Sequence, residues 1–145
     1  MQIHTNCSSP SRVIHAPGEI ILAAIGNFLE DPAAERKPRP AIVLSSGECH
    51  HFIIGLTTQP KHKTTGNQRS AFPSPAACGL DRSGYLWSSR PTRLSRLDAL
   101  KHLGWIDHET VKVMASTMKL SSAIFTDLWR AAEKHHPRRC QALSL

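Results

Sequence analysis

The sequence lacks the features that mark membrane-spanning and exported proteins. Its longest apolar run, residues 20–25, is far shorter than the roughly 18 residues that a membrane-spanning helix requires. The first residues, MQIHTNCSSP, contain no positive charge followed by an apolar stretch, so they do not form a secretory signal. We therefore expect a cytoplasmic protein that has no contact with a membrane.

Motifs of several common enzyme classes are also missing. The chain contains no GxGxxG, GxxxxGKS/T, HExxH or GxSxG pattern, which disfavours dinucleotide enzymes, P-loop proteins, zinc proteases and α/β-hydrolases. Its four cysteines form no CxxC pair, so we expect free thiols. The neighbours His50 and His51 would point to opposite faces of a strand and could not easily share one ion. Neither a metal nor a cofactor is expected.

The chain is long enough for one domain and carries a surplus of positive charge. Its 145 residues can bury about two-thirds of the unfolded surface. Lys and Arg number 18 against 11 Asp and Glu, which gives a net charge of +7. This surplus suits a polyanion such as nucleic acid, because each phosphate that Lys or Arg neutralises releases condensed counterions.

Hydrophobic periodicity predicts strands followed by helices. Short apolar runs between turn residues predict strands over residues 18–26, 40–46, 51–58 and 85–89, with a hairpin between the second and the third. Asp107 is the expected N-cap of a helix that ends near Leu120, and a second helix starts at Ser121 or Ser122 and ends before Pro137. Residues 103–106 are expected to turn into the first helix. The order predicts a mainly β, α+β fold with C-terminal helices.

Several short segments occur in an order that carries a resemblance. They are GEI at residues 18–20, RPAIVLS at 39–45, LTTQ at 56–59, YLW at 85–87 with a downstream TRL, and LGWI at 103–106. Together they resemble the PemK/MazF family of type II toxin–antitoxin ribonucleases, across about residues 18–120. The RPAIVLS segment and its spacing to TTQ are the more specific part of the pattern.

The resemblance implies a fold, an activity and partners. It implies a small, curved SH3-like barrel over residues 18–120, usually a homodimer, between a flexible N-terminal arm (1–17) and an extra helix and tail (121–145). The implied activity is that of an mRNA interferase, a metal-independent endoribonuclease. It cleaves single-stranded RNA by attack of a 2′-OH on the adjacent phosphate. An acidic antitoxin protein would hold this activity in check.

The resemblance assigns Arg39 and Thr57 to the catalytic centre. A guanidinium can stabilise the charge that develops on the phosphorane, and a Thr hydroxyl can hold a reacting oxygen in place. Thr57 would share a strand face with Gly55, where the missing side chain leaves room for a ligand. Arginine is a poor proton shuttle because its pKa lies above 12. Proton transfer would therefore suit a further group, for which the candidates are His51, His62 and Glu19.

The predicted RNA-binding residues extend from this centre into the following basic loop and strand. They are Thr58, Gln59, Lys61, Lys63, Arg69, Arg90 and Arg93. Members of the family commonly carry a second arginine in a Gln-x-Arg-Thr strand. Here residues 88–93 read SSRPTR, without the Gln and with an interposed proline, so either Arg90 or Arg93 takes that role.

Two other functions stay open. The chain could be a non-catalytic module of the same barrel type that binds nucleic acid or poisons a topoisomerase. It could also be an inert or structural protein of that fold. RNA cleavage that persists in a chelator and disappears in Arg39→Ala separates the enzyme from both.

Overall fold

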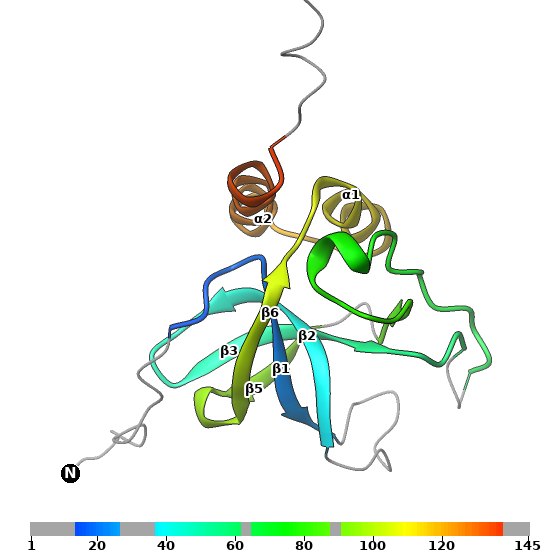
Figure 1. The fold of residues 1–145 in the computed structure, drawn as a ribbon, viewed down its shortest axis with the longest axis horizontal. Coiled ribbons are helices and arrows are strands. Elements are labelled where there is room, and N and C mark those ends of the chain that lie inside the picture. Colours follow the sequence, from blue (N-terminus) through cyan, green and yellow to red (C-terminus); the bar gives the residue numbers. More distant parts are fainter. Residues whose placement is uncertain (1–13, 27–36, 62–64, 88–90, 138–145) are drawn as a thin grey trace, which may run out of the picture.

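The computed structural model describes residues 14–26, 37–61, 65–87 and 91–137 (Figure 1). The strands are β1 (Glu19–Ile25), β2 (Lys37–Ser46), β3 (His50–Thr57), β4 (Tyr85–Leu86), β5 (Thr92–Ser95) and β6 (Ala99–Trp105). The helices α1 (His108–Thr117) and α2 (Ser122–His135) follow, and the short 3-10 turns are η2 (Ala76–Cys78) and η3 (Arg96–Asp98). This order confirms the predicted α+β class with helices at the C-terminal end. No helix within the described ranges is long and apolar enough to span a membrane.

All six strands belong to one antiparallel sheet. Its order is β4-β3-β2-β1-β6, and β5 pairs with the first half of β3 beside β4. The expected hairpin between β2 and β3 is confirmed, with the Gly47 amide donating to the carbonyl oxygen of His50. Turn η3 alone joins β5 to β6, but no ladder joins these two strands within the described residues, so the sheet is not closed.

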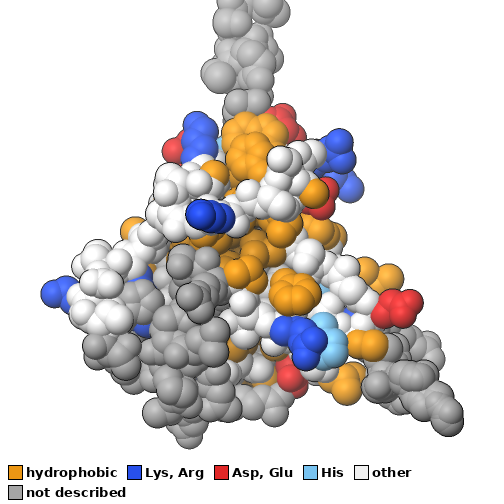
Figure 2. All heavy atoms as spheres, turned by 180° about the vertical axis from the view of Figure 1, so that it is seen from behind, with side chains coloured by type: hydrophobic (Ala, Val, Ile, Leu, Met, Phe, Trp, Pro, Cys, Tyr) orange, Lys and Arg blue, Asp and Glu red, His pale blue; other side chains and the backbone are white. Residues whose placement is uncertain are grey.

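One face of the sheet is covered by the two helices (Figure 1). Its side chains form one apolar cluster with α1 and α2; the fully buried members include Ile20, Ile42, Leu44, Met114 and Leu128. On the side seen in Figure 2, hydrophobic side chains gather at the helical end of the molecule. Because α2 contributes to this cluster and packs against β2 and β6, it belongs to the core of the same unit.

The other face of the sheet, which we call the inner face, holds a second cluster without helical residues. Strands β1, β2, β3, β5 and β6 contribute to it, together with Trp87; examples are Ile21, Val43, Ile53 and Leu94. Near-continuous apolar runs such as residues 41–44 thus have both faces covered, as their pattern predicts, because alternate residues enter different clusters.

Most element boundaries were predicted within a few residues. The N-caps Asp107 and Ser121 are confirmed, since their side chains accept from the amides of Thr110 and Ile124. The expected turn over residues 103–106 is wrong, because β6 occupies Ala99–Trp105. Its partner β1 pairs with it through two register shifts, which break the alternation that a sequence pattern requires.

Two further expectations concern the N-terminal arm and the thiols. Residues 1–13 of the predicted arm lie outside the described residues, but His15 is only 2% exposed and its carbonyl oxygen accepts from the Ser46 hydroxyl. The prediction of free thiols holds for buried Cys78 and is wrong for Cys49, which is disulfide-bonded. A disulfide is typical of oxidising compartments and does not support the expected cytoplasmic location. That location stays a prediction.

Candidate nucleic-acid site

A notch opens in the sheet where β2 and β3 diverge. Their register ends with Ala41 opposite Gly55, while β2 continues along β1 as far as the pair Ile25–Lys37. Proline has no amide proton to donate to a ladder, and β2 carries two prolines in KPRPAI at its start. Two residues beyond the last pair stand Arg39 on β2 and Thr57 on β3, both on the inner face.

Both predicted catalytic residues line one pocket in this notch. The pocket has a volume of about 420 Å³, and Lys37, Thr58 and Arg82 also line it. Its apolar surface comes from Pro38, Pro40, Leu56, Phe72 and Leu80. The strand register and the pocket therefore bring Arg39 and Thr57 together on one side of the sheet, as the proposed chemistry requires.

Arg39 is held in the notch by its neighbours. Its Nε donates to the carbonyl oxygen of Ile25 at 3.2 Å. Its Cζ lies 4.6 Å from the centre of the Trp87 ring, within the range of a cation–π interaction. The flat guanidinium is thereby oriented before any ligand arrives, which is what electrostatic stabilisation of a transition state requires.

Arg69 also holds Trp87 in place. It is 5% exposed, and its Nε donates to the carbonyl oxygen of Trp87 at 3.0 Å. Its Nη1 donates to the carbonyl oxygens of Gln59 and Lys61 at 3.0 and 2.8 Å. These bonds tie the loop after β3 to Trp87, so Arg69 positions the ring over which Arg39 lies.

Thr57 presents its hydroxyl at the end of β3. The oxygen accepts from the amide of Gln59 at 3.2 Å, which fixes the oxygen and leaves the O–H proton to be donated to a phosphate oxygen. Thr58 lines the same pocket although the strand ends at Thr57. Both threonines can therefore contact one ligand, which alternation along a continuing strand would not permit.

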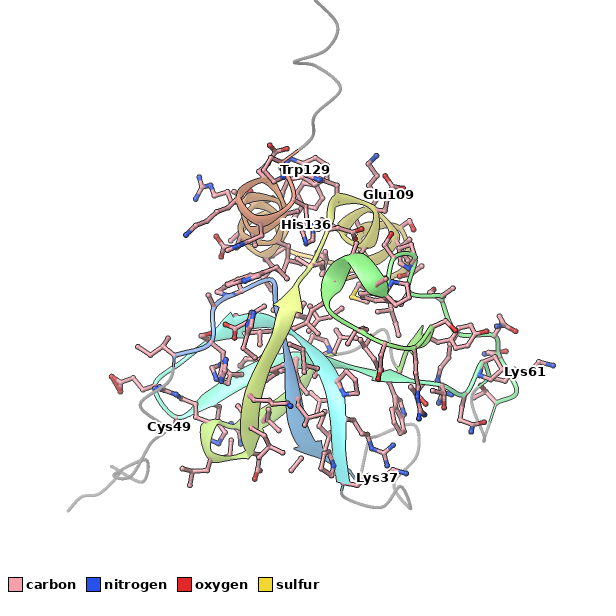
Figure 3. The ribbon with its side chains drawn as sticks, viewed as in Figure 1. Lys37, Cys49, Lys61, Glu109, Trp129 and His136 are labelled. Atoms are coloured by element: carbon pink, nitrogen blue, oxygen red, sulfur yellow. The ribbon has the colours of Figure 1, made fainter. Side chains whose placement is uncertain are left out.

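The other predicted RNA-binding residues are not all brought to the pocket. Arg93 pairs with Phe52 on β3, so both lie on the face opposite to that of Thr57, far along the strand. Lys61 is exposed in the loop after β3, away from the helical end (Figure 3). Arg90 and Lys63 lie outside the described residues.

Three charged residues of the pocket were missed by the sequence analysis. Lys37 precedes the RPAIVLS segment, and Asp81 and Arg82 follow Leu80 in a polar stretch with no periodicity. Arg82 supplies a second pocket arginine where the sequence pointed to Arg90 or Arg93. The charged, glycine-flanked composition of residues 79–84 marks a surface loop but does not indicate which strands it approaches.

The loop of residues 80–84 lines one wall of the pocket and has close backbone contacts at both ends. A Cβ at Gly104 would collide with the carbonyl oxygen of Cys78, and one at Gly79 with that of Leu103. At the other end, a Cβ at Gly84 would lie 3.0 Å from the carbonyl oxygen of Thr57. Close backbone contacts at both ends therefore fix this wall against β6 and β3.

None of the described candidates for proton transfer reaches the pocket. Glu19 is 5% exposed and accepts from His15 and His102 at 2.6 and 2.9 Å, at the opposite end of β1 from Arg39. His51 is 1% exposed and lies beside His15. His62 is outside the described residues. Glu19, His15, His102 and His51 lie together away from the pocket, and we call them the histidine network.

No protein-family model matches the chain, and a comparison with curated proteins finds no match. The functional argument therefore depends on the residues of the pocket and on the segments that carry the resemblance.

Proposed function

We propose that the protein is a metal-independent endoribonuclease that cleaves single-stranded RNA, the toxin of a toxin–antitoxin pair. The observation that carries the proposal is that Arg39 and Thr57 line one pocket with further basic residues. The resemblance selected these two residues without reference to the pocket. Because Arg39 and Thr57 line the same pocket, they support the assignment of a catalytic centre more than either residue does alone.

The chemistry of the proposed step is an in-line transfer at phosphorus. The bond from O2′ to phosphorus forms and the bond from phosphorus to O5′ breaks, while one proton leaves the 2′-OH and another reaches the 5′-oxygen. The products are a 2′,3′-cyclic phosphate and a 5′-hydroxyl. Arg39 would stabilise the negative charge on the phosphorane oxygens, and Thr57 would hold one of them by a hydrogen bond.

The proposed fold of residues 18–120 is a small SH3-like barrel. The inner-face cluster draws side chains from five strands and from no helix, as expected for the interior of a strongly curled sheet. Turn η3 also connects the outer strands β5 and β6 within three residues. In the proposed complexes a homodimer forms, and an acidic segment of the antitoxin covers the basic pocket.

The decisive test uses purified protein and a long single-stranded RNA, with and without EDTA. The wild type should produce cyclic-phosphate ends in both conditions. Arg39→Ala should lower the cleavage rate by roughly 10²- to 10³-fold, the usual effect of removing one group that stabilises transition-state charge. Thr57→Val should also lower the cleavage rate. Arg130→Ala, an exposed arginine on α2, is the matched control and should cleave at the wild-type rate.

The alternative is a nucleic-acid-binding module without catalysis, including a poison of topoisomerase. One observation favours it: the described lining of the pocket contains no histidine that could transfer a proton at neutral pH. RNA binding that Arg39→Ala weakens, without new RNA ends in the wild type, would establish this alternative and overturn the nuclease.

A further inference from the structure

The pocket contains a single carboxylate among its described lining residues, Asp81. An isolated carboxylate is unexpected in a surface that is to bind RNA, because it repels the phosphate backbone and weakens binding. Asp81 is also not a residue of a free loop, since the wall of residues 80–84 is fixed at both ends by backbone contacts at Gly79 and Gly84. Together with its neighbour Arg82, Asp81 gives this wall an acceptor and a donor that a ligand in the pocket can meet.

The two walls differ in the ligand groups that they suit. Strands β2 and β3 supply Lys37, Arg39 and Thr57, which suit a phosphate. The apolar lining includes Pro38 and Pro40 on β2 and Leu80 beside Asp81, and it suits the flat face of a base. The carboxylate can then meet the edge of that base. A volume of about 420 Å³ lies within the range of small-molecule sites, about 300–1,000 Å³.

We propose that Asp81 selects guanine at the nucleotide that occupies this pocket, an inference that rests on the proposed binding of single-stranded RNA there. Guanine alone presents two adjacent donors on its Watson–Crick edge, N1–H and the N2 amino group, and a carboxylate has two acceptor oxygens to meet them. Adenine and cytosine each present a ring nitrogen acceptor beside their amino group. Uracil presents one donor between two carbonyl oxygens. These three bases would place an acceptor against Asp81 and be repelled.

The test separates binding from cleavage. Short labelled RNAs that differ only in one central nucleotide carry a 2′-deoxyribose there, so that this position cannot be cleaved, and their affinities are measured by fluorescence anisotropy. The wild type should bind the guanine RNA about 5- to 100-fold more tightly than the other three, the range of a good bidentate base contact. Replacing guanine by hypoxanthine, which lacks the N2 amino group, should remove much of this advantage.

Asp81→Asn changes the acceptor pair to one acceptor and one donor. The guanine preference should disappear, and adenine, which an amide can bind in a bidentate manner, should gain affinity. Asp127→Asn, an exposed carboxylate on α2, is the matched control and should keep the wild-type order of the four RNAs. Far-UV circular dichroism shows whether each variant is folded.

The outcomes separate this inference from the proposed nuclease. If Asp81→Asn strengthens the binding of all four RNAs equally, the carboxylate only repels the backbone and the guanine contact is wrong. If it abolishes cleavage of all-ribose RNA without changing the order of affinities, Asp81 is a proton acceptor and the guanine contact is also wrong. A guanine preference without cleavage supports the inference and overturns the nuclease. The absence of RNA binding overturns both.

Discussion

The two faces of the sheet bury different kinds of side chain. The helix-covered face is mostly apolar, with Ile42 and Leu128 fully buried. The inner face is apolar only in its middle. At one end the guanidiniums of Arg39 and Arg69 lie near the ring of Trp87, and at the other His15 and His102 contact Glu19.

This difference separates the part of the core that stabilises the fold from the parts that position polar groups. Apolar burial is non-directional and tolerates small shifts, whereas each buried polar group needs a partner at a defined distance. Leu56 and Phe72 of the helix-covered cluster also line the pocket, so a packing change should affect the pocket little only where it lies at the helices, away from these two residues. A shift of the inner face displaces the ring over which Arg39 lies.

The largest expected effect is on stability, from a cavity under the helices. Leu128 on α2 is 0% exposed, so Leu128→Ala should lower the free energy of unfolding by about 2–5 kcal/mol, measured by urea denaturation. The RNA affinity of the folded fraction should stay at the wild-type value. Leu100→Ala, at a position that is 50% exposed, is the control and should cost less than about 1 kcal/mol. A folded Leu128→Ala protein with weakened RNA binding would contradict the separation of the two faces.

An intermediate effect is expected where β6 supports the wall of the pocket. A Cβ at Gly104 would collide with the carbonyl oxygen of Cys78, so Gly104→Ala should destabilise by about 1–3 kcal/mol through overpacking. Unlike Leu128→Ala, it should also weaken RNA binding, because the displaced backbone leads into residues 80–84. Both quantities come from the same urea and anisotropy measurements.

The matched control for this glycine is Gly66→Ala. Gly66 has a φ of +71° and no atom within 4 Å of an added Cβ, so the substitution introduces backbone strain without a collision. It should lower stability and leave RNA affinity unchanged. Equal losses of affinity in the two glycine variants would show that the wall does not depend on its contact with β6.

The elements that the sequence predicted well are those in which one local pattern decides the structure. The apolar runs of β1, β2 and β3 lie between turn residues, and the caps at Asp107 and Ser121 act within their own helices. Strand β6 was missed because its exposed residues LKH interrupt the apolar pattern and its register along β1 shifts twice. Its position depends on its partner strand and not on its own composition.

Prediction of the candidate site was also limited where a residue's position depends on distant parts of the chain. Arg39 and Thr57 were identified because they belong to segments with a recognisable order, and strand alternation correctly placed Thr57 on the face of Gly55. Arg82 and Asp81 could not be found in this way, since a loop far along the chain reaches the pocket only through contacts of glycine backbones. Residue type alone also did not show that Arg69 is bonded to three carbonyl oxygens.

The smallest expected effect concerns pH and the histidine network on the inner face. Burial lowers the pKa of His51 below its ordinary value of 6.5, and the charges of His15 and Arg96 lower it further, while Glu19 opposes them. As the pH drops through about 6.5, His51 is therefore protonated in the unfolded chain but stays neutral in the folded protein. Stability is complete above this pH and falls as the pH drops below it. Between pH 7.5 and 5.5 the free energy of unfolding should decrease by about 1 kcal/mol.

Substitution of His51 tests the origin of this loss. Neither of its ring nitrogens has a hydrogen-bond partner among the described residues, so His51→Leu removes a buried polar group and should flatten the pH dependence without lowering stability at pH 7.5. A smaller slope should remain, because the pKa of His135 is also lowered, by burial and then by Lys134. Below about pH 4.5 a second loss should follow in both proteins. Burial of Glu19 opposes its ionisation and raises its pKa. Hydrogen bonds from His15 and the other partners of Glu19 outweigh this effect and hold the pKa below 4.5. Urea midpoints measured at each pH would contradict this account if His51→Leu keeps the full wild-type slope between pH 7.5 and 5.5.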